Sequence, residues 1–287
     1  MAKFNKVITQ RVDYADSFYV WFNTVKNRKE KWVRCANGNR EWALREVCPG
    51  RYFEDRFMSA QGFLAAILGY QSEIPWAVNG VIDGGGATAD PAAGNFVAAN
   101  EIGGGVSMIG GDTVGATGDT GDYTAIGWGA NYPAMLRVSP HFHCTFAPIL
   151  LTTAFHFAGL VDNTRPAARA AFALPDNGIF AYHDTGVDNL VHLIIRSGAV
   201  SVTDFTMAAP AGGTHAGMHI QTSDDGNFVR FIFQGTAVVP WVDVTGAAYA
   251  GLVAAQLQPY MAVGIRANNI QRELHLHDFR LIIDRGF

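Results

Sequence analysis

The sequence predicts an all-β sandwich preceded by a small segment of mixed structure. In the second half of the chain, turn signals built from glycine, aspartate or asparagine recur roughly every ten residues, the spacing of β-sandwich proteins. The stretches between these turns are rich in β-branched and aromatic residues, which favour strands. Helical periodicity is confined to one short stretch, so we do not expect helices to supply the core.

The composition permits a large hydrophobic core. Of the 287 residues, 49% are hydrophobic and 16% are charged, which excludes wholesale disorder. No apolar run reaches the roughly 18 residues that a membrane-spanning helix needs. The first residues, Met1 to Lys6, lack the apolar stretch of a secretory signal, which predicts synthesis in a cytoplasm without export. Cys35, Cys48 and Cys144 fit neither a zinc site nor a disulfide scaffold, and we expect them to be reduced.

Charge is distributed unevenly along the chain. Residues 1–70 contain 12 Lys and Arg against 7 Asp and Glu, a net charge of +5, whereas residues 71–287 have a net charge of −9. This asymmetry predicts two surfaces with different partners, and a solvated basic face is the alternative. Because the acidic body would repel phosphates, nucleic acid is not expected as a partner of the whole chain.

Residues 1–72 form the small mixed segment. The Asn37-Gly38 turn lies between Trp32–Arg34 and Glu41–Leu44, a pattern typical of a β-hairpin. Residues 59–70 place apolar side chains at helical spacing after a serine in the N-cap position, which predicts one short helix.

Basic and aromatic side chains are interleaved in this first segment. Since Trp and Arg dominate the energetics of protein interfaces, we expect the segment to anchor the chain to a partner protein and to support oligomerisation. Two alternatives stay open, a grip on single-stranded nucleic acid and plain core packing. The residues expected to contact the partner are Trp21, Trp32, Arg34, Trp42 and Arg51.

Residues 73–130 hold 15 of the 32 glycines of the chain. This stretch has no lysine and so no phosphate-binding P-loop, and the glycines at 103 and 105 lack the third glycine of a dinucleotide-binding motif. We expect the glycines to serve turns and bulges of a β protein, where a residue without Cβ tolerates positive φ.

The rest of the chain predicts a series of short strands. Its strongest local signal is the loop Ser223–Asn227, in which Gly226 can take the left-handed conformation of a hairpin. After the loop, Val229, Phe231 and Phe233 alternate as in a half-buried strand. The expected strands cover residues 141–146, 152–161, 178–183, 190–196, 217–222, 228–233, 236–239, 261–266 and 273–283.

Four segments resemble, in order and spacing, strands of the concanavalin A-like jelly-roll domains of tailed-bacteriophage structural proteins. They are Gly121–Ile126 with its G-D-Y start, Thr214–Val238 with its D-G turn, Leu257–Arg266 with its L-x-P-Y start, and His277–Leu281. The chain departs from the pattern at Gln234, where Asn is common.

This resemblance implies a jelly-roll sandwich over residues 73–287 and a place on the surface of a virion. The chain would be a capsid decoration (cement) protein or a fibre component of head or tail, assembled in the host cytoplasm. Its partner would be a major capsid or tail protein. Because shells and tails have rotational symmetry, we expect a homo-oligomer, with a trimer as the first expectation. No nucleic-acid or membrane partner is expected.

The sequence offers no constellation for catalysis. A glycoside hydrolase on such a scaffold needs two opposed carboxylates, and Glu73, Glu101 and Glu273 are not arranged in that way. No nucleophile motif is present, and Asp224 and Asp225 belong to a turn. We therefore expect a protein that is not an enzyme and that holds no cofactor.

Two histidine pairs have the i, i+2 spacing that places both side chains on one face of a strand: His141 with His143, and His275 with His277. If their strands were neighbours, four histidines could hold Zn²⁺. Outward-facing or hydrogen-bonded histidines are the more frequent case, and we expect no metal site.

A glycan-binding, lectin-like receptor-binding protein is the alternative function, with a host-surface glycan as ligand. Sugar rings stack on aromatic side chains, although each of the four candidates could equally be a core residue. The candidates are Trp128, Tyr132, Tyr182 and Trp241.

Overall fold

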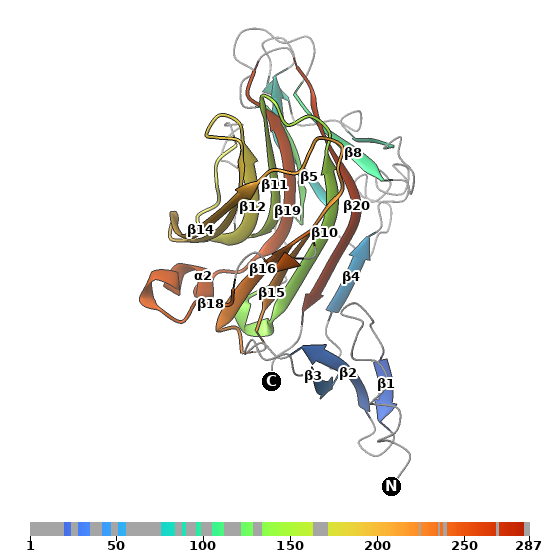
Figure 1. Ribbon diagram of the computed structural model, residues 1–287, viewed down its shortest axis with the longest axis vertical. Coiled ribbons are helices and arrows are strands. Elements are labelled where there is room, and N and C mark those ends of the chain that lie inside the picture. Colours follow the sequence, from blue (N-terminus) through green and yellow to red (C-terminus); the bar gives the residue numbers. More distant parts are fainter. Residues whose placement is uncertain are drawn as a thin grey trace.

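The computed structural model shows that the chain is almost entirely β-structure, in three antiparallel sheets (Figure 1). It describes residues 20–23, 28–34, 42–46, 51–55, 76–83, 88–89, 96–98, 105–111, 122–128, 134–162, 172–223, 225–234, 236–237, 240–267 and 270–283. The all-β fold class predicted from the sequence is confirmed. No helix within these ranges is long and apolar enough to cross a membrane.

The first layer of the sandwich is a nine-stranded sheet. Its main path runs β17-β16-β15-β10-β20-β8-β7, while β18 pairs with β16 and β4 pairs with β20. The strands are β4 (Arg51–Asp55), β7 (Phe96–Ala98), β8 (Val106–Gly110), β10 (Pro140–Pro148), β15 (Ala216–Thr222), β16 (Phe228–Phe233), β17 (Thr236–Ala237), β18 (Val242–Asp243) and β20 (Arg272–Ile283).

The second layer is an eight-stranded sheet in the order β14-β13-β12-β11-β19-β9-β5-β6, and it faces the first (Figure 1). Its strands are β5 (Ala77–Asp83), β6 (Thr88–Ala89), β9 (Tyr123–Gly127), β11 (Ala154–Val161), β12 (Gly178–Asp184), β13 (Leu190–Ser197), β14 (Val200–Ala208) and β19 (Gln258–Ile265). The described helical turns are η3 (Leu136–Val138), η4 (Ala247–Tyr249) and α2 (Ala250–Ala254).

The main core fills the space between the two sheets. As the period-two pattern predicts, Val229, Phe231 and Phe233 of β16 are all buried there. In this core, the rings of Trp76 and Phe279 meet edge to face with centroids 4.8 Å apart. Aromatic pairs in this geometry add to the stabilisation that burial of their area provides.

A second apolar cluster covers the other face of the eight-stranded sheet. Phe155 and Phe157 of β11 belong to it, and Phe172 and Leu174 pack on it from the segment before β12. Every residue of β11 and of β12 is buried, which explains why these strands are apolar at nearly every position. The eight-stranded sheet is therefore covered on both faces over these strands.

Glycine meets the predicted conformational need at two described positions. Gly226 has φ +75° in the loop between β15 and β16, as the hairpin signal predicts. Gly105, just before β8, has φ +145°, and a Cβ there would lie 2.9 Å from the backbone oxygen of Leu276, so a side chain has no room.

The expected strands of the second half are all present, and four described elements there were not predicted: β14, β18, η4 and α2. Strand β14 is half-buried or exposed throughout and contains Ser, Thr and Asp, so it lacks the apolar signal of a core strand. Helix α2 has five residues, too few to show a period. The helix predicted over residues 59–70 lies outside the described residues, as do Cys35 and Cys48.

The N-terminal strands β1 (Val20–Asn23), β2 (Arg28–Arg34) and β3 (Trp42–Glu46) form a separate three-stranded sheet at one end of the molecule (Figure 1). The pairing of β2 with β3 confirms the predicted hairpin and sets Arg34 opposite Trp42. Trp21 and Trp32 lie in β1 and β2.

Arg51 belongs instead to β4, which pairs with β20 of the sandwich. The first 72 residues therefore do not all lie apart from the sandwich. The reason is the length of β20: β8 pairs with Arg272–Leu276, and β4 continues along the same edge, opposite Phe279–Ile283.

Two histidines, His156 on β11 and His183 on β12, lie opposite each other inside the sandwich. Their Nδ1 atoms are 3.4 Å apart, and Nε2 of His156 is buried without a hydrogen-bond partner beside a cavity of about 30 Å³. Burial, with smaller contributions from the charges of His183 and then Arg272, lowers the pKa of His156 to about 3. This histidine is neutral in the folded protein at ordinary pH.

Because His156 stays neutral in the folded protein, we expect the protein to lose stability in acid. In the unfolded chain this histidine takes up a proton near its ordinary pKa of about 6.5. The contribution of His156 to the free energy of unfolding is therefore complete above that pH and falls by about 1.4 kcal/mol per pH unit below it. His156→Phe should flatten this slope in urea unfolding measured between pH 7.5 and pH 4.5. The exposed His215→Gln serves as the control, and an unchanged slope in His156→Phe would contradict the assignment.

Candidate functional site

The outer face of the nine-stranded sheet carries the main collection of polar side chains. They alternate with core residues such as Phe142, Met218 and Leu281, and we call them the polar face. It consists of Ser107 on β8, His141, His143 and Thr145 on β10, His215 just before β15, His219 and Gln221 on β15, Arg230 on β16, and Glu273, His275, His277, Asp278 and Arg280 on β20.

The register of the strands aligns these side chains in rows across the sheet. His219 lies opposite His143, which in turn lies opposite Arg280. Next to this row, Gln221 lies between Arg230 and His141. Residues directly opposite in an antiparallel pair have neighbouring Cβ atoms, so each row is a line of adjacent groups.

A bulge in β20 adds a polar side chain to this face. Thr145 of β10 pairs with Asp278, but the next residue, Phe146, pairs with Leu276, so His277 is the extra residue. Because of it, His277 and Asp278 both fit between the core residues Leu276 and Phe279.

Asp278 is the charged centre of the polar face. One of its oxygens lies 3.1 Å from Nη2 of Arg280 and 3.6 Å from Nδ1 of His143. The ring of His143 lies against that of His219, tilted by 33°, with centroids 4.0 Å apart. A carboxylate beside a histidine favours its N–H on the near side, which directs the other ring nitrogen, Nε2, away from Asp278.

A second carboxylate joins β20 to β8. Oε2 of Glu273 accepts a hydrogen bond from the Ser107 hydroxyl at 2.9 Å and lies 3.1 Å from Nε2 of His275. Serine and histidine thus both contact the carboxylate, an arrangement unlike a nucleophilic triad, in which histidine stands between the other two.

Trp241 lies at the far end of the polar face. The guanidinium carbon of Arg230 is 4.5 Å from the centroid of its ring, and Arg230 donates two hydrogen bonds to Gln221, at 2.8 and 2.6 Å. Of the three glycan candidates that the structure describes, Trp241 is the one that lies on the polar face.

The other glycan candidates lie elsewhere. Trp128 is 2% exposed and packs in the main core near Trp76, so it occupies the core position that the sequence left open. Tyr182 is 8% exposed and belongs to the apolar cluster of the eight-stranded sheet. Tyr132 lies outside the described residues.

The two histidine pairs do come from neighbouring strands, since β10 pairs with β20. They are offset along the sheet, however: His143 lies opposite Arg280, and His275 lies opposite Ala147. Within the part of the chain that the structure describes, no three His, Cys, Asp or Glu side chains are placed to hold a metal ion.

Cys144 faces the core, on the opposite side of β10 from the histidines. Burial, and after it the charge of Asp278, raise the pKa of its thiol well above the ordinary value. A protonated, buried thiol is no nucleophile. The chemistry that the polar face does offer is hydrogen bonding, charge pairing and proton transfer through histidine.

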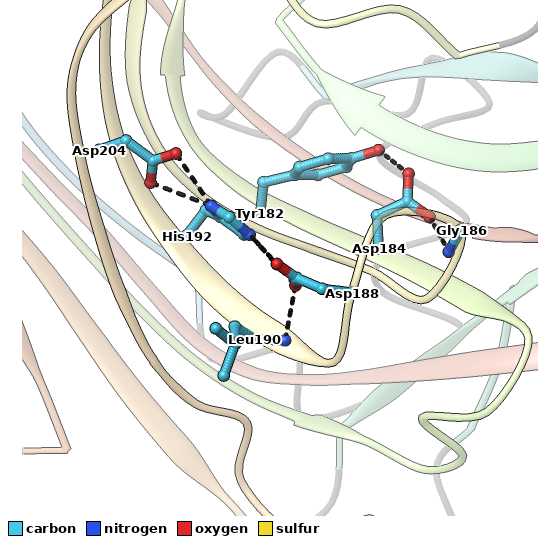
Figure 2. A network of polar contacts seen from close by, with 7 residues as sticks. All are labelled: Tyr182, Asp184, Gly186, Asp188, Leu190, His192 and Asp204. Atoms are coloured by element: carbon cyan, nitrogen blue, oxygen red, sulfur yellow. Dashed lines mark hydrogen bonds and ion pairs between the residues drawn. The ribbon is translucent and has the colours of Figure 1, made fainter.

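A second polar network lies on the eight-stranded sheet (Figure 2). The Tyr182 hydroxyl donates to Asp184, which also accepts a hydrogen bond from Nε of Arg266 at 2.7 Å and from the backbone N–H of Gly186 at 2.8 Å. These contacts outweigh burial and lower the pKa of Asp184. Burial and the adjoining carboxylate raise the pKa of Tyr182. This network holds the turn between β12 and β13.

His192 joins that turn to the edge strand β14. Its Nδ1 lies 3.0 Å from both oxygens of Asp204, and its Nε2 lies 3.2 and 3.1 Å from those of Asp188 (Figure 2). Burial lowers the pKa of His192, but the hydrogen bonds and charges of the two carboxylates outweigh it, and the net shift is upward.

His192→Gln should therefore cost more stability in mild acid than in base. A raised folded-state pKa gives stability that is complete below about pH 6.5 and is lost as pH rises through the folded value. In urea unfolding, the difference between the original chain and the variant should be larger at pH 5.5 than at pH 8.5. An equal difference at both values would show that the two carboxylates do not favour the charged imidazole.

No protein-family model matches the sequence, and no curated protein is similar to it. Similarity appears among solved structures. A putative β-glucanase from Mycobacterium abscessus is similar with a TM-score of 0.53 and 11% identity, over 80% of this chain and 98% of that chain. A protein of unknown function from Shewanella oneidensis MR-1 has a TM-score of 0.50 and 9% identity, over 83% and 90% of the two chains.

A carbohydrate esterase of the Shiga toxin-encoding bacteriophage phi24B is also similar, with a TM-score of 0.41 and 10% identity over 73% of this chain and 90% of that chain. The β-glucanase shows the fold: the chain is a concanavalin A-like jelly-roll sandwich, as the resemblance implied.

The same likeness contradicts the expectation that the chain is not an enzyme. A protein described as a putative glucanase has this sandwich, so the sandwich cannot be used to exclude catalysis. A pair of opposed glutamates was also too narrow a criterion, because the register brings His143, His219 and Arg280 into one row and places Asp278 in the next.

Sequence reasoning found part of the polar face and missed the rest. The i, i+2 spacing located His143 and His275, and Trp241 was named for its aromatic ring. Asp278, Arg280, His219 and Arg230 were missed because their common face depends on which strands are neighbours. The bulge at His277 has no signal of its own in the sequence.

Proposed function

We propose that the chain recognises carbohydrate through the polar face. The observation that carries the proposal is the row of planar polar groups that ends at Trp241. Sugars present dense hydroxyl groups and apolar ring faces, and they are held by such hydrogen-bonding groups together with an aromatic ring. The fold is compatible with this role, since the solved structures that share it include a putative glucanase.

The polar face has room for a ligand beside His143. Gly217 lies opposite Thr145 and presents no side chain, and a methyl group in its place would be 3.9 Å from Nε2 of His143. Hydroxyl groups entering this gap would meet the His143 ring and Thr145. In the register of the strands, this gap lies in the same row as Thr145 and Asp278, and the row of His143 and His219 separates it from the row that leads to Trp241.

Binding to an immobilised glycan panel tests the proposal. Arg230→Ala combined with Trp241→Ala should weaken the binding of the glycans that the original chain retains by about tenfold or more, the cost of losing a central contact. Val187→Ala, 70% exposed on the turn of the other sheet, is the matched control. If no glycan is retained, or if the double variant binds as the original does, the polar face is not a carbohydrate site. Reducing ends released in the same incubations would show cleavage in addition.

We further propose that the chain is a virion structural protein, a decoration or fibre component, which attaches through its N-terminal strands. Two features support this proposal: the resemblance of its strand motifs, and the separate sheet β1–β3 that contains Trp21, Trp32, Arg34 and Trp42. Because β4 is part of the sandwich, the attachment unit would end before Arg51.

Two deletions separate attachment from folding. A chain lacking residues 1–46 keeps β4 and should unfold as the original does, yet it should no longer sediment with particles of the phage that encodes it. A chain lacking residues 1–56 also loses β4 and the pairing along β20, which should cost about 2 kcal/mol or more. The proposal fails if the shorter deletion still sediments with the particles.

A further inference from the structure

The space between the two sheets contains a small cavity that is separate from the polar face. It lies where β10, β16 and β20 of one sheet face β11, β12 and β13 of the other, and its volume is about 30 Å³. Most of its wall is apolar and comes from both sheets and from the loop before β11. The apolar side chains of the wall include Phe146, Leu151, Ala158, Val191, Phe233 and Leu274.

His156 supplies an unsatisfied polar atom to this cavity. Its side chain is part of the wall, the residue is 6% exposed, and its Nε2 is buried without a hydrogen-bond partner. The other polar side chains of the wall are engaged: the Tyr182 hydroxyl donates to Asp184, and Nδ1 of His183 faces Nδ1 of His156. A buried polar atom without a partner costs free energy, so a ligand that bonds to Nε2 gains a contact that the folded chain does not make.

The histidine pair can offer the cavity either a donor or an acceptor. His156 is neutral in the folded protein, and its Nδ1 lies 3.4 Å from that of His183, so one ring donates to the other. When His156 donates, its Nε2 is an acceptor; when His183 donates, Nε2 of His156 carries the hydrogen. A hydroxyl group both donates and accepts, and it therefore fits the pair in either tautomer.

Water has room in the cavity but finds few partners there. A buried water molecule typically makes about three hydrogen bonds, whereas Nε2 of His156 is the buried side-chain atom of the described wall that lacks a partner. A molecule with one hydroxyl group and a short apolar body uses that nitrogen and places its carbon atoms against the apolar wall. Since one water needs about 10–15 Å³ of such space, the cavity of about 30 Å³ admits two or three non-hydrogen atoms.

We propose that this cavity binds a small neutral alcohol, whose hydroxyl group bonds to Nε2 of His156. The site lies between the sheets and is independent of the carbohydrate recognition proposed for the outer face. The charge of Arg272, which acts on His156, disfavours a cation, and an anion would lose its hydration against the apolar wall. So few atoms give a weak affinity, with a Kd of about 1 mM at best.

Ethanol, which has three non-hydrogen atoms, is the probe. In the full chain with isotope-labelled methyl groups, the NMR signals of Val191 and Leu274 in the cavity wall should shift as ethanol is added. The shifts should saturate with a Kd of about 1–10 mM. tert-Butanol is too large for the cavity, so its effect on the same signals should stay linear without saturation.

Variants separate the nitrogen from the space. His156→Phe keeps an aromatic ring in the wall but removes Nε2, and it should weaken ethanol binding about tenfold or more. Ala181→Val keeps the nitrogen and fills part of the cavity, so saturation should disappear. Ala158→Val fills the cavity from the neighbouring strand, should Ala181→Val unfold. The exposed His215→Gln is the matched control and should bind ethanol as the original chain does.

Three results would overturn the inference. The first is a linear shift of equal size in the original chain and in every variant, which is a general solvent effect. The second is ethanol binding that is unchanged in His156→Phe. The third is a long-lived water molecule at His156, detected by magnetisation transfer from water, that ethanol does not displace. None of these results bears on the glycan panel, because the cavity and the polar face lie on opposite sides of the nine-stranded sheet.

Discussion

The twelve residues of β20 join the sandwich to its polar face. One edge of the strand bonds to β10, and the other bonds first to β8 and then to β4. Its inner side chains, among them Leu274 and Phe279, belong to the main core. Strict alternation after Leu276 would turn Asp278 inward, where an unpaired carboxylate costs several kcal/mol. The bulge at His277 restores the alternation one residue later, so core packing and the position of Asp278 have a common cause.

The two sheets differ in what they leave accessible. Strands β11 and β12 are buried on both faces, because an aromatic cluster with Phe172 covers the side that would otherwise meet water. Polar chemistry on that sheet is found at its turns and edge, where Asp184 and His192 fix the ends of strands. The nine-stranded sheet buries one face and keeps polar groups on the other. The difference in covering, more than any single residue, determines where this sandwich can meet a ligand.

Local sequence pattern predicted the strands well because burial of one face imposes a period of two. The run from Phe228 to Phe233 shows that period, and it lies where the pattern placed it. Strand β14 escaped prediction because an edge strand buries too little to need apolar residues. The candidate site was harder to foresee, since His219, His143 and Arg280 come from three separate segments. Their proximity depends on strand order, which the hydrophobic pattern of one strand does not encode.

The pairing of β4 with β20 has a consequence for how the protein reaches its native state. The two strands are separated by most of the chain, so their contact has a high loop-closure cost and belongs to the slow class of folding topologies. During synthesis β4 and β10 both emerge long before their shared partner. Until β20 arrives, their hydrogen-bonding edges stay open to other chains, as edge strands do. Expression yield and aggregation should therefore respond to the integrity of the last strand more than to that of any earlier one.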